Sequence, residues 1–236
     1  MFFTQRAKLN THMTDLSSKE CIPRSLLPDC SGGPAICPNA EKIQQLKQQV
    51  ITDPLTGLYN SAHLRTVLAN EIERSQRTYI PTALVMLDLD HFKQVNDSYG
   101  HEAGNAVLIQ TAKLIQVNTR QLDIQCRYGG EEFAIVLPST ERFLAIQVAG
   151  RIRESIANTT VEYNQQQLQV TASIGLAFYQ PGESKSVSSL INEADKYLYQ
   201  AKEQGRNQVR YTEFKKDQSS AVSHDEKEAL HNLFSD

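Results

Sequence analysis

Apolar residues recur along the chain in two patterns, one typical of buried strands and one typical of helices that cover a sheet. Short apolar runs bounded by turn residues predict strands over residues 84–90, 124–128, 133–137 and 209–211. A β-rich stretch at 161–179 predicts a short strand, a polar turn at residues 165–167 and a continuous strand over residues 168–177. Apolar residues three and four apart predict helices over residues 61–77, 102–119 and 140–158, and a last helix through residues 190–201 that Gly205 caps. Strand pairs interleaved with helices, without a Gly-rich phosphate loop, predict an α+β fold.

The two ends of the chain fall outside this pattern. Residues 1–38 carry Pro and Gly without periodicity, and residues 213–236 form a polar tail, so we assign a fold to neither. Residues 39–52 place apolar residues at helical spacing, which predicts a linker helix. That helix either packs on its own domain or pairs two subunits, and two heptads are too few to decide between these alternatives.

A glycine turn followed by acids joins two of the predicted strands. Gly129 and Gly130 can adopt positive φ without strain, so they predict a tight hairpin turn, and Glu131 and Glu132 come directly after it. Taken alone, these acids fit a solvated surface hairpin.

A second acidic strand end changes that interpretation. The apolar strand upstream ends in Asp88-Leu89-Asp90, so its carboxylates and those of Glu131 and Glu132 can converge on one point. Hard divalent cations, Mg²⁺ above all, bind through oxygen ligands of this kind. The sequence therefore predicts a magnesium site where the two strands end.

Composition narrows the class of protein. The chain has 236 residues, of which 40% are hydrophobic and 22% are charged, as in ordinary globular domains. Its formal net charge of -3 gives no indication of a nucleic-acid or membrane surface, so we expect neither as a partner. No apolar run is long enough to span a bilayer and the first residues lack a signal-peptide core, so we expect a cytoplasmic location.

Three of the four cysteines lie in the N-terminal segment, at Cys21, Cys30 and Cys37. They could bind a metal with His12 as a fourth ligand, although their spacing does not match a short zinc knuckle. The alternative is free or redox-responsive thiols, and both interpretations stay open. Cys126 lies in a predicted strand and is expected to be buried.

The glycine turn resembles the signature of the GGDEF domain of diguanylate cyclases, because residues 129–133 read Gly-Gly-Glu-Glu-Phe. Two further motifs stand in the family's order: Asp-x-Leu-Thr-Gly-Leu-x-Asn at residues 53–60, which we name the opening motif, and Ser-Ile-Gly-x-Ala at residues 173–177. The resemblance covers nearly all of residues 53–212, which we assign as the catalytic domain. It implies a nucleotidyl-cyclase palm-like fold: a five-stranded, mostly antiparallel central sheet flanked by helices and preceded by a linker helix.

The resemblance also implies the parts of an active site. Each subunit would bind one GTP and hold two Mg²⁺ ions through Asp88, the Leu89 carbonyl and Glu131. Glu131 is the first choice for accepting the proton of the attacking 3′-hydroxyl, and Glu132 is the second. The residues implied to bind the nucleotide are Phe92 and Lys93 through their backbone amides, Lys93 also through its ammonium group, Asn96 and His101 at the guanine, Asn105, and Lys202 and Arg206 at the phosphates.

The chain departs from the family's usual residues at two places. Asn105 stands where the family usually has Asp. An amide keeps one acceptor for guanine, but its donor-plus-acceptor pattern also suits adenine, so a mixed base choice stays an alternative. Ser61 and Ala62 stand where the family usually has two arginines, which removes basic side chains close to the opening motif.

A second nucleotide site is implied by Arg120 and Asp123, which match the family's R-x-x-D inhibitory motif, together with Arg151. The implied function is a diguanylate cyclase that condenses two GTP into cyclic di-GMP with release of two pyrophosphates. It would act as a homodimer and be inhibited by its product. The alternatives are a catalytically silent module that binds GTP or cyclic di-GMP, and a relaxed cyclase that makes cyclic GMP-AMP.

Overall fold

The computed structural model describes residues 51–212. The N-terminal segment with its three thiols, nearly all of the linker helix and the polar tail lie outside the described residues, so the predictions made for them stay predictions. No helix within the described range is long and apolar enough to cross a membrane.

The described residues form eight strands and five helices. The strands are β1 (Tyr59–Asn60), β2 (Thr82–Leu89), β3 (Ile124–Arg127), β4 (Glu132–Leu137), β5 (Thr160–Tyr163), β6 (Gln166–Gln169), β7 (Ala172–Tyr179) and β8 (Val209–Tyr211). The helices are α2 (Ser61–Thr78), α3 (Phe92–Tyr99), α4 (His101–Asn118), α5 (Arg142–Ala157) and α6 (Val187–Glu203). The first three predicted helices agree with α2, α4 and α5 to within two residues, and the last one lies inside α6.

Six of the strands form one mixed sheet in the order β1-β3-β4-β2-β7-β8, and β5 and β6 form a separate hairpin. The pairs in the middle of the sheet are antiparallel, whereas β1 and β8 add in parallel at its two edges. The predicted α+β fold with a mostly antiparallel sheet is confirmed, but the prediction of five strands was wrong by one. The additional strand is β1, whose two residues belong to the opening motif and are too few to show a period of two.

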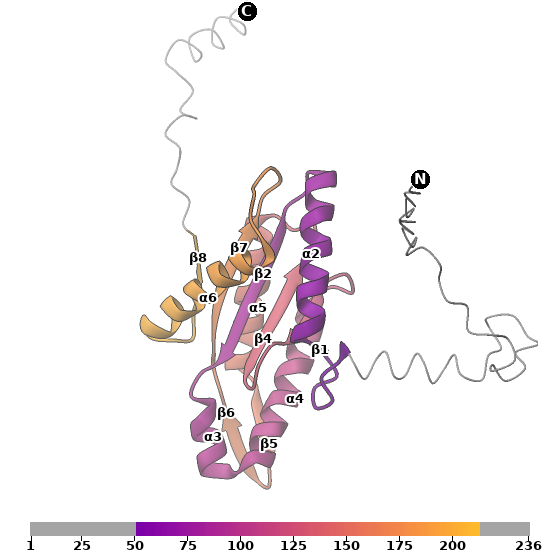
Figure 1. Cartoon of the computed structure of the whole chain (residues 1–236). Coiled ribbons are helices and arrows are strands. Elements are labelled where there is room, and N and C mark those ends of the chain that lie inside the picture. Colours follow the sequence, from indigo (N-terminus) through magenta and orange to yellow (C-terminus); the bar gives the residue numbers. More distant parts are fainter. Residues whose placement is uncertain (1–50, 213–236) are drawn as a thin grey trace, which may run out of the picture. The chain divides into compact units, whose positions relative to one another are not determined.

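Alternation along β2 divides the hydrophobic core between the two faces of the sheet. Val85 and Leu87 belong to the core cluster shared with α4 and α5, whereas Leu84 and Met86 belong to the cluster shared with α2 and α6. Figure 1 shows α2 and α6 over one face of the sheet. Asp88 continues the alternation of Leu84 and Met86, so it ends β2 on the face that α6 covers.

The β-rich stretch is interrupted at Thr171, where the sequence predicts a continuous strand. Thr171 lies between β6 and β7; its carbonyl accepts from the Asp90 N–H at 2.9 Å, and its hydroxyl donates to the Asp90 carboxylate at 2.7 Å. The backbone bond continues the antiparallel pairing of β2 with β7 by one residue, and the β5–β6 hairpin before it forms a sheet of its own. The turn of that hairpin uses Asn164 and Gln165, both with positive φ, rather than residues 165–167.

Candidate active site

Two strands bring their acidic ends together at one edge of the sheet. Asp88 in β2 lies directly opposite Glu132 in β4, and the Leu89 N–H donates to the Glu131 carbonyl at 3.3 Å. Asp88 is 6% exposed, while both glutamates are half-buried. The carboxylates of two neighbouring strand ends therefore lie close together, as the magnesium prediction requires.

These carboxylates repel one another. Burial raises the pKa of Glu131 and of Glu132, and the negative charge of Asp88 raises both further. Burial also raises the pKa of Asp88, against the lowering effect of Lys202. A divalent cation would relieve this repulsion, and a ligand set made only of oxygen suits Mg²⁺. Among the described residues no three acidic, His or Cys side chains surround a common point.

Lys202 in α6 lies above the acidic strand ends. Its Nζ is 2.8 Å from the Asp88 carboxylate. Burial raises the pKa of Glu131, Glu132 and Asp195, and the charge of Lys202 opposes that rise at all three. The sequence prediction missed Asp195, which stands about two helical turns before Lys202 and so on the same face of α6. That spacing is the signal that could have found it.

Close packing of α6 on the sheet sets the position of Lys202. A Cβ built on Gly175 in β7 would overlap the Ala194 carbonyl oxygen and the Leu198 backbone nitrogen, both in α6. Only glycine therefore lets the helix approach β7 this closely. Because β7 pairs with β2, the same contact fixes Lys202 relative to Asp88.

Arg206 lies beyond the end of α6, as the sequence predicts. The helix ends at Glu203, and Gly205 follows with a φ of 110°. The Arg206 side chain is exposed, and its charge lowers the pKa of Asp88 against the larger effect of burial. Both basic residues predicted for the phosphates therefore act on the same acidic strand end.

Asp90 is a buried acid with a different role from Asp88. Its carboxylate accepts from the hydroxyls of Thr171 and Ser173 at 2.7 and 2.6 Å and from the Asn207 N–H at 3.0 Å. It therefore ties the end of β2 to β7 and to the loop after α6. The Asp-x-Asp pattern predicts two acids at the end of β2, but it does not indicate which carboxylate is occupied by hydrogen bonds within the domain.

The two glycines of the hairpin turn do not adopt the backbone conformation that the sequence predicts. Neither Gly129 nor Gly130 has a positive φ, so the predicted backbone conformation was wrong. A Cβ on Gly129 would instead lie 2.5 Å from Oε2 of Glu132, because the glutamate side chain folds back over the turn. The N–H groups of Tyr128 and Gly129 close the turn by donating to the Glu132 carbonyl at 2.8 and 3.2 Å.

Arg127 joins this turn to the opening motif, a role that the sequence prediction missed. Its guanidinium donates to the Gly130 carbonyl at 2.7 Å and pairs with the Asp53 carboxylate at 3.1 Å. Burial opposes ionisation of Asp53, but hydrogen bonds from Thr56 and the charge of Arg127 lower its pKa overall. The opening motif therefore supports the loop that precedes Glu131.

The residues predicted to hold the base lie on the other face of the sheet, where α3 meets α4. Asn96 in α3 and Asn105 in α4 are half-buried, and the Phe92 side chain is buried in the core cluster of that face. Lys93 and His101 are exposed near the starts of α3 and α4. No side chain caps the N-terminus of α3, so its first backbone N–H groups can meet an anion.

The residues of the predicted inhibitory site also come together. The Arg120 N–H donates to the Asp123 carboxylate at 2.7 Å, which shapes the turn before β3. Burial raises the pKa of Asp123, and the charges of Arg120 and Arg151 oppose that rise. The Arg151 guanidinium donates to the Asn118 carbonyl at the end of α4. Two guanidinium groups thus flank one buried carboxylate.

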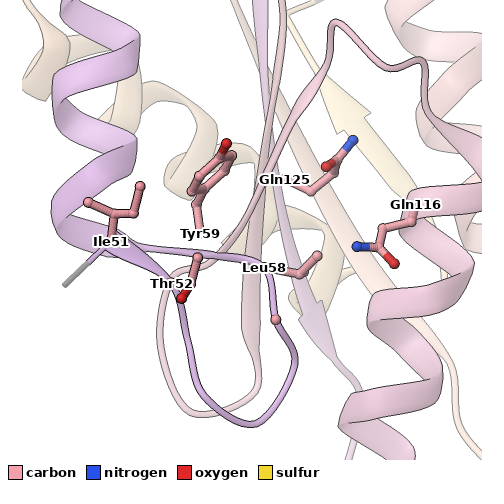
Figure 2. Close-up of a pocket in the computed structure, with 7 residues that line it drawn as sticks. Ile51, Thr52, Leu58, Tyr59, Gln116 and Gln125 are labelled. Atoms are coloured by element: carbon pink, nitrogen blue, oxygen red, sulfur yellow. The ribbon is translucent and has the colours of Figure 1, made fainter. Parts of the chain in front are cut away.

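A cavity of about 510 Å³ lies beside the opening motif. Figure 2 shows Tyr59 and Leu58 of that motif together with Gln116 of α4 and Gln125 of β3. None of its described lining residues is charged, and none belongs to the predicted site. A triphosphate requires cationic partners, so this cavity is not a candidate for the substrate site.

Comparison with known proteins identifies similar sequences. The family described as "Diguanylate cyclase, GGDEF domain" matches residues 50–208. The response regulator PleD of Caulobacter vibrioides is 38% identical over 161 residues, which are 67% of this chain and 35% of that protein. Diguanylate cyclase A of Treponema denticola is 39% identical over 168 residues, or 70% of this chain and 45% of that protein. The chain thus spans less than half the length of these curated relatives.

Solved structures show the same fold. The diguanylate cyclase SiaD of Pseudomonas aeruginosa, in complex with its activator SiaC, has 40% sequence identity and a TM-score of 0.67, over 73% of this chain and 65% of that one. The coiled coil and GGDEF domain of DgcB from Caulobacter crescentus, in complex with c-di-GMP, has 29% identity and a TM-score of 0.69, over 73% and 91%.

Proposed function

Because the chain belongs to the GGDEF-domain family of diguanylate cyclases, we propose that it condenses two molecules of GTP into cyclic di-GMP and releases two pyrophosphates. The observation that carries this proposal is the meeting of Asp88 with Glu131 and Glu132 at neighbouring strand ends, with Lys202 above them. Acidic oxygens for a cation, next to a lysine for phosphate charge, are what phosphoryl transfer needs.

Asp88, the Leu89 carbonyl and Glu131 are the proposed ligands of two Mg²⁺ ions. When bound, Mg²⁺ supplies polarisation of the α-phosphate and acidification of the 3′-hydroxyl. Glu131 is the proposed acceptor of the hydroxyl proton, and Glu132 is the second choice. Burial raises the pKa of both carboxyl groups, which makes either a better proton acceptor than a fully solvated carboxylate.

The triphosphate is proposed to lie between α3 and α6. The backbone amides of Phe92 and Lys93 in the uncapped first turn of α3 would donate to phosphate oxygens, and the exposed Lys93 ammonium can reach them. Lys202 and Arg206 would stabilise charge on the transferring and leaving phosphates. The base would lie toward α4, where the Asn96 side chain of α3 would form hydrogen bonds with its edge.

The remaining proposals concern assembly and control. One site holds one GTP, and a product ring with two-fold symmetry needs two, so two subunits must face each other in a homodimer. Cyclic di-GMP is proposed to inhibit the enzyme by binding to Arg120 and Arg151, with the second carboxylate oxygen of Asp123 accepting from guanine. GTP is a cytoplasmic metabolite, so we propose that the reaction takes place in the cytoplasm.

The proposal is tested by incubating the purified chain with Mg²⁺ and GTP and separating the nucleotides by chromatography. The expected products are cyclic di-GMP and pyrophosphate in a ratio of one to two. Replacing Glu131→Gln should lower turnover by about 100-fold or more, because it removes both a metal ligand and the proton acceptor. The matched control is Glu73→Gln on the exposed side of α2, which should leave turnover within about twofold.

Two other outcomes correspond to the alternatives. Tight binding of cyclic di-GMP without turnover would favour a silent binding module. Incorporation of AMP from an equimolar mixture of ATP and GTP would favour a cyclase with relaxed base choice. The second alternative is favoured by Asn105, whose amide lies beside the proposed base and offers both a donor and an acceptor.

A further inference from the structure

Gly104 in the first turns of α4 has an unusual neighbour. A Cβ built on it would overlap Oδ1 of Asn96 and would lie 3.0 Å from the Asn96 Cγ and 3.1 Å from the Phe92 Cζ. The Asn96 carboxamide of α3 therefore occupies the space that a side chain would fill at residue 104. The backbone of α4 is buried at this point, so the carboxamide lies directly against it.

The carboxamide held in this way is available to a ligand. Within residues 51–212 the Asn96 side chain is half-buried and makes no hydrogen bond to another residue. The same holds for Asn105, the residue next to Gly104 on α4. Each amide offers two donors and two acceptor positions to a ligand. The Asn96 carboxamide against Gly104 and the Asn105 amide next to Gly104 in the sequence are neutral groups suited to the hydrogen-bonding edge of a nucleobase.

We propose that Gly104 is a positioning residue for base recognition: its missing side chain makes the space in which the Asn96 carboxamide is held against α4, next to Asn105. This inference rests on the proposed function, because it takes the ligand to be a guanine nucleotide. It assigns to Gly104 the placement of the base and no part in the chemistry at the phosphates. Substitution of Gly104 should therefore change nucleotide affinity and leave the chemical step intact.

The identity of the overlapping atom decides how a substitution would act. The Asn96 Oδ1 is the far end of a flexible side chain, which can rotate away from a new methyl group at little cost to the fold. The displaced amide no longer meets the base, and losing hydrogen bonds to a bound ligand weakens binding by about tenfold. Alanine also favours a helix over glycine, so folding stability should not fall.

The chain offers a matched control for this experiment. Gly150 lies within α5, has an ordinary helical φ, and a Cβ built on it would meet nothing within 4 Å. Gly104→Ala and Gly150→Ala are therefore the same substitution in a helix, and only the first displaces a side chain. Each variant is compared with the unmodified full chain for Tm, for binding of GTP and of ITP, and for kcat and KM.

Gly104→Ala is expected to raise the Kd and KM for GTP by about tenfold, with kcat and Tm matching Gly150→Ala. ITP lacks the 2-amino group of GTP, so the preference of the unmodified chain for GTP over ITP should shrink in Gly104→Ala. Repeating the substitution in an Asn96→Ala background should give no further loss, because the amide that it displaces is already gone.

Equal Kd values for Gly104→Ala and Gly150→Ala would overturn the inference, as would a tenfold loss that persists in the Asn96→Ala background. The proposed function is judged separately, from turnover by the unmodified chain. Because Kd is measured directly, the role of Gly104 is still tested if the unmodified chain binds GTP without turning it over. Failure of the unmodified chain to bind GTP at all would overturn both.

Discussion

The two faces of the sheet carry side chains of different chemistry near the ends of β2 and β4. The face under α6 carries charge: Lys202 pairs with Asp88 at 2.8 Å, and Glu131 and Glu132 lie close by. The face under α3 and α4 carries the neutral amides of Asn96 and Asn105. We expect the side chains under α6 to bind cations and phosphates together with the first turn of α3, and the amides of Asn96 and Asn105 to bind the base.

The two faces also depend on glycine in different ways. The space that a Cβ would need at Gly175 is filled by the backbone of α6, whereas at Gly104 it is filled by the end of the Asn96 side chain. A backbone cannot move without moving the helix that carries Lys202. A carboxamide can move alone. An added methyl group should therefore disturb the whole α6 face in the first case and one hydrogen-bonding group in the second.

The largest effect should come from Gly175→Ala. The new Cβ would overlap backbone atoms of Ala194 and Leu198, so α6 must shift off the sheet. Overpacking of this kind costs about 1 to 3 kcal/mol of folding free energy or more, and the shift should lower turnover by displacing Lys202. Chemical denaturation and the GTP assay measure the two effects. Stability equal to that of Gly150→Ala would show that the close approach of α6 is not needed.

A smaller loss is expected from Asp90→Asn. The Asp90 carboxylate accepts three hydrogen bonds. The side-chain NH₂ of Asn would face at least one of the groups that donate them, and one of these bonds would be lost. We expect a loss of about 1 kcal/mol in the free energy of unfolding. The control is Asp97→Asn on the exposed surface of α3. Equal denaturation midpoints for the two variants would contradict a structural role for Asp90.

The smallest effect should appear in the pH dependence of stability. Burial raises the folded-state pKa of Asp88, Glu131 and Glu132 above the ordinary values near 3.8 and 4.5, and the charge of Asp88 raises the pKa of both glutamates further. Between the unfolded and the raised values the folded state binds more protons, so stability falls as pH rises through that interval and stays lower above it. Replacing Glu132→Gln removes one of these charges and should reduce the decline.

Tm measured in a chelating buffer from about pH 4 to pH 7 tests this expectation. At the higher pH the Glu132→Gln variant should exceed the unmodified chain by about 2 °C, and at the lower pH the two should converge. Glu73→Gln serves as the control, since Glu73 is exposed on α2. Parallel curves for Glu132→Gln and the unmodified chain would show that the repulsion is fully screened.

Much of the fold could be predicted because its elements have strong local patterns. The helices and the strands β2, β3 and β4 follow apolar periods long enough to detect. β1 could not be found, because two residues have no period. The end of β6 before Thr171 could not be found either, because Thr171 bonds to Asp90, which is far away in the sequence and leaves no local pattern.

The candidate site divides in the same way. The meeting of Asp88 with Glu131 was predictable, because both residues end apolar strands. The surroundings of Gly129 were not, since its close neighbour is the end of the Glu132 side chain and its φ is not positive. Asp195 was missed because its partner Lys202 was interpreted only as a phosphate ligand. The atoms that surround Gly129 cannot be inferred from the order of residues in the sequence.

Arg127 connects the opening motif directly to the loop before Glu131. One guanidinium holds both the Asp53 carboxylate, where the chain enters the domain, and the Gly130 carbonyl, directly before Glu131. A displacement of the backbone at residue 53 would thus be transmitted to the loop before Glu131 through one side chain, without a rearrangement of the hydrophobic core.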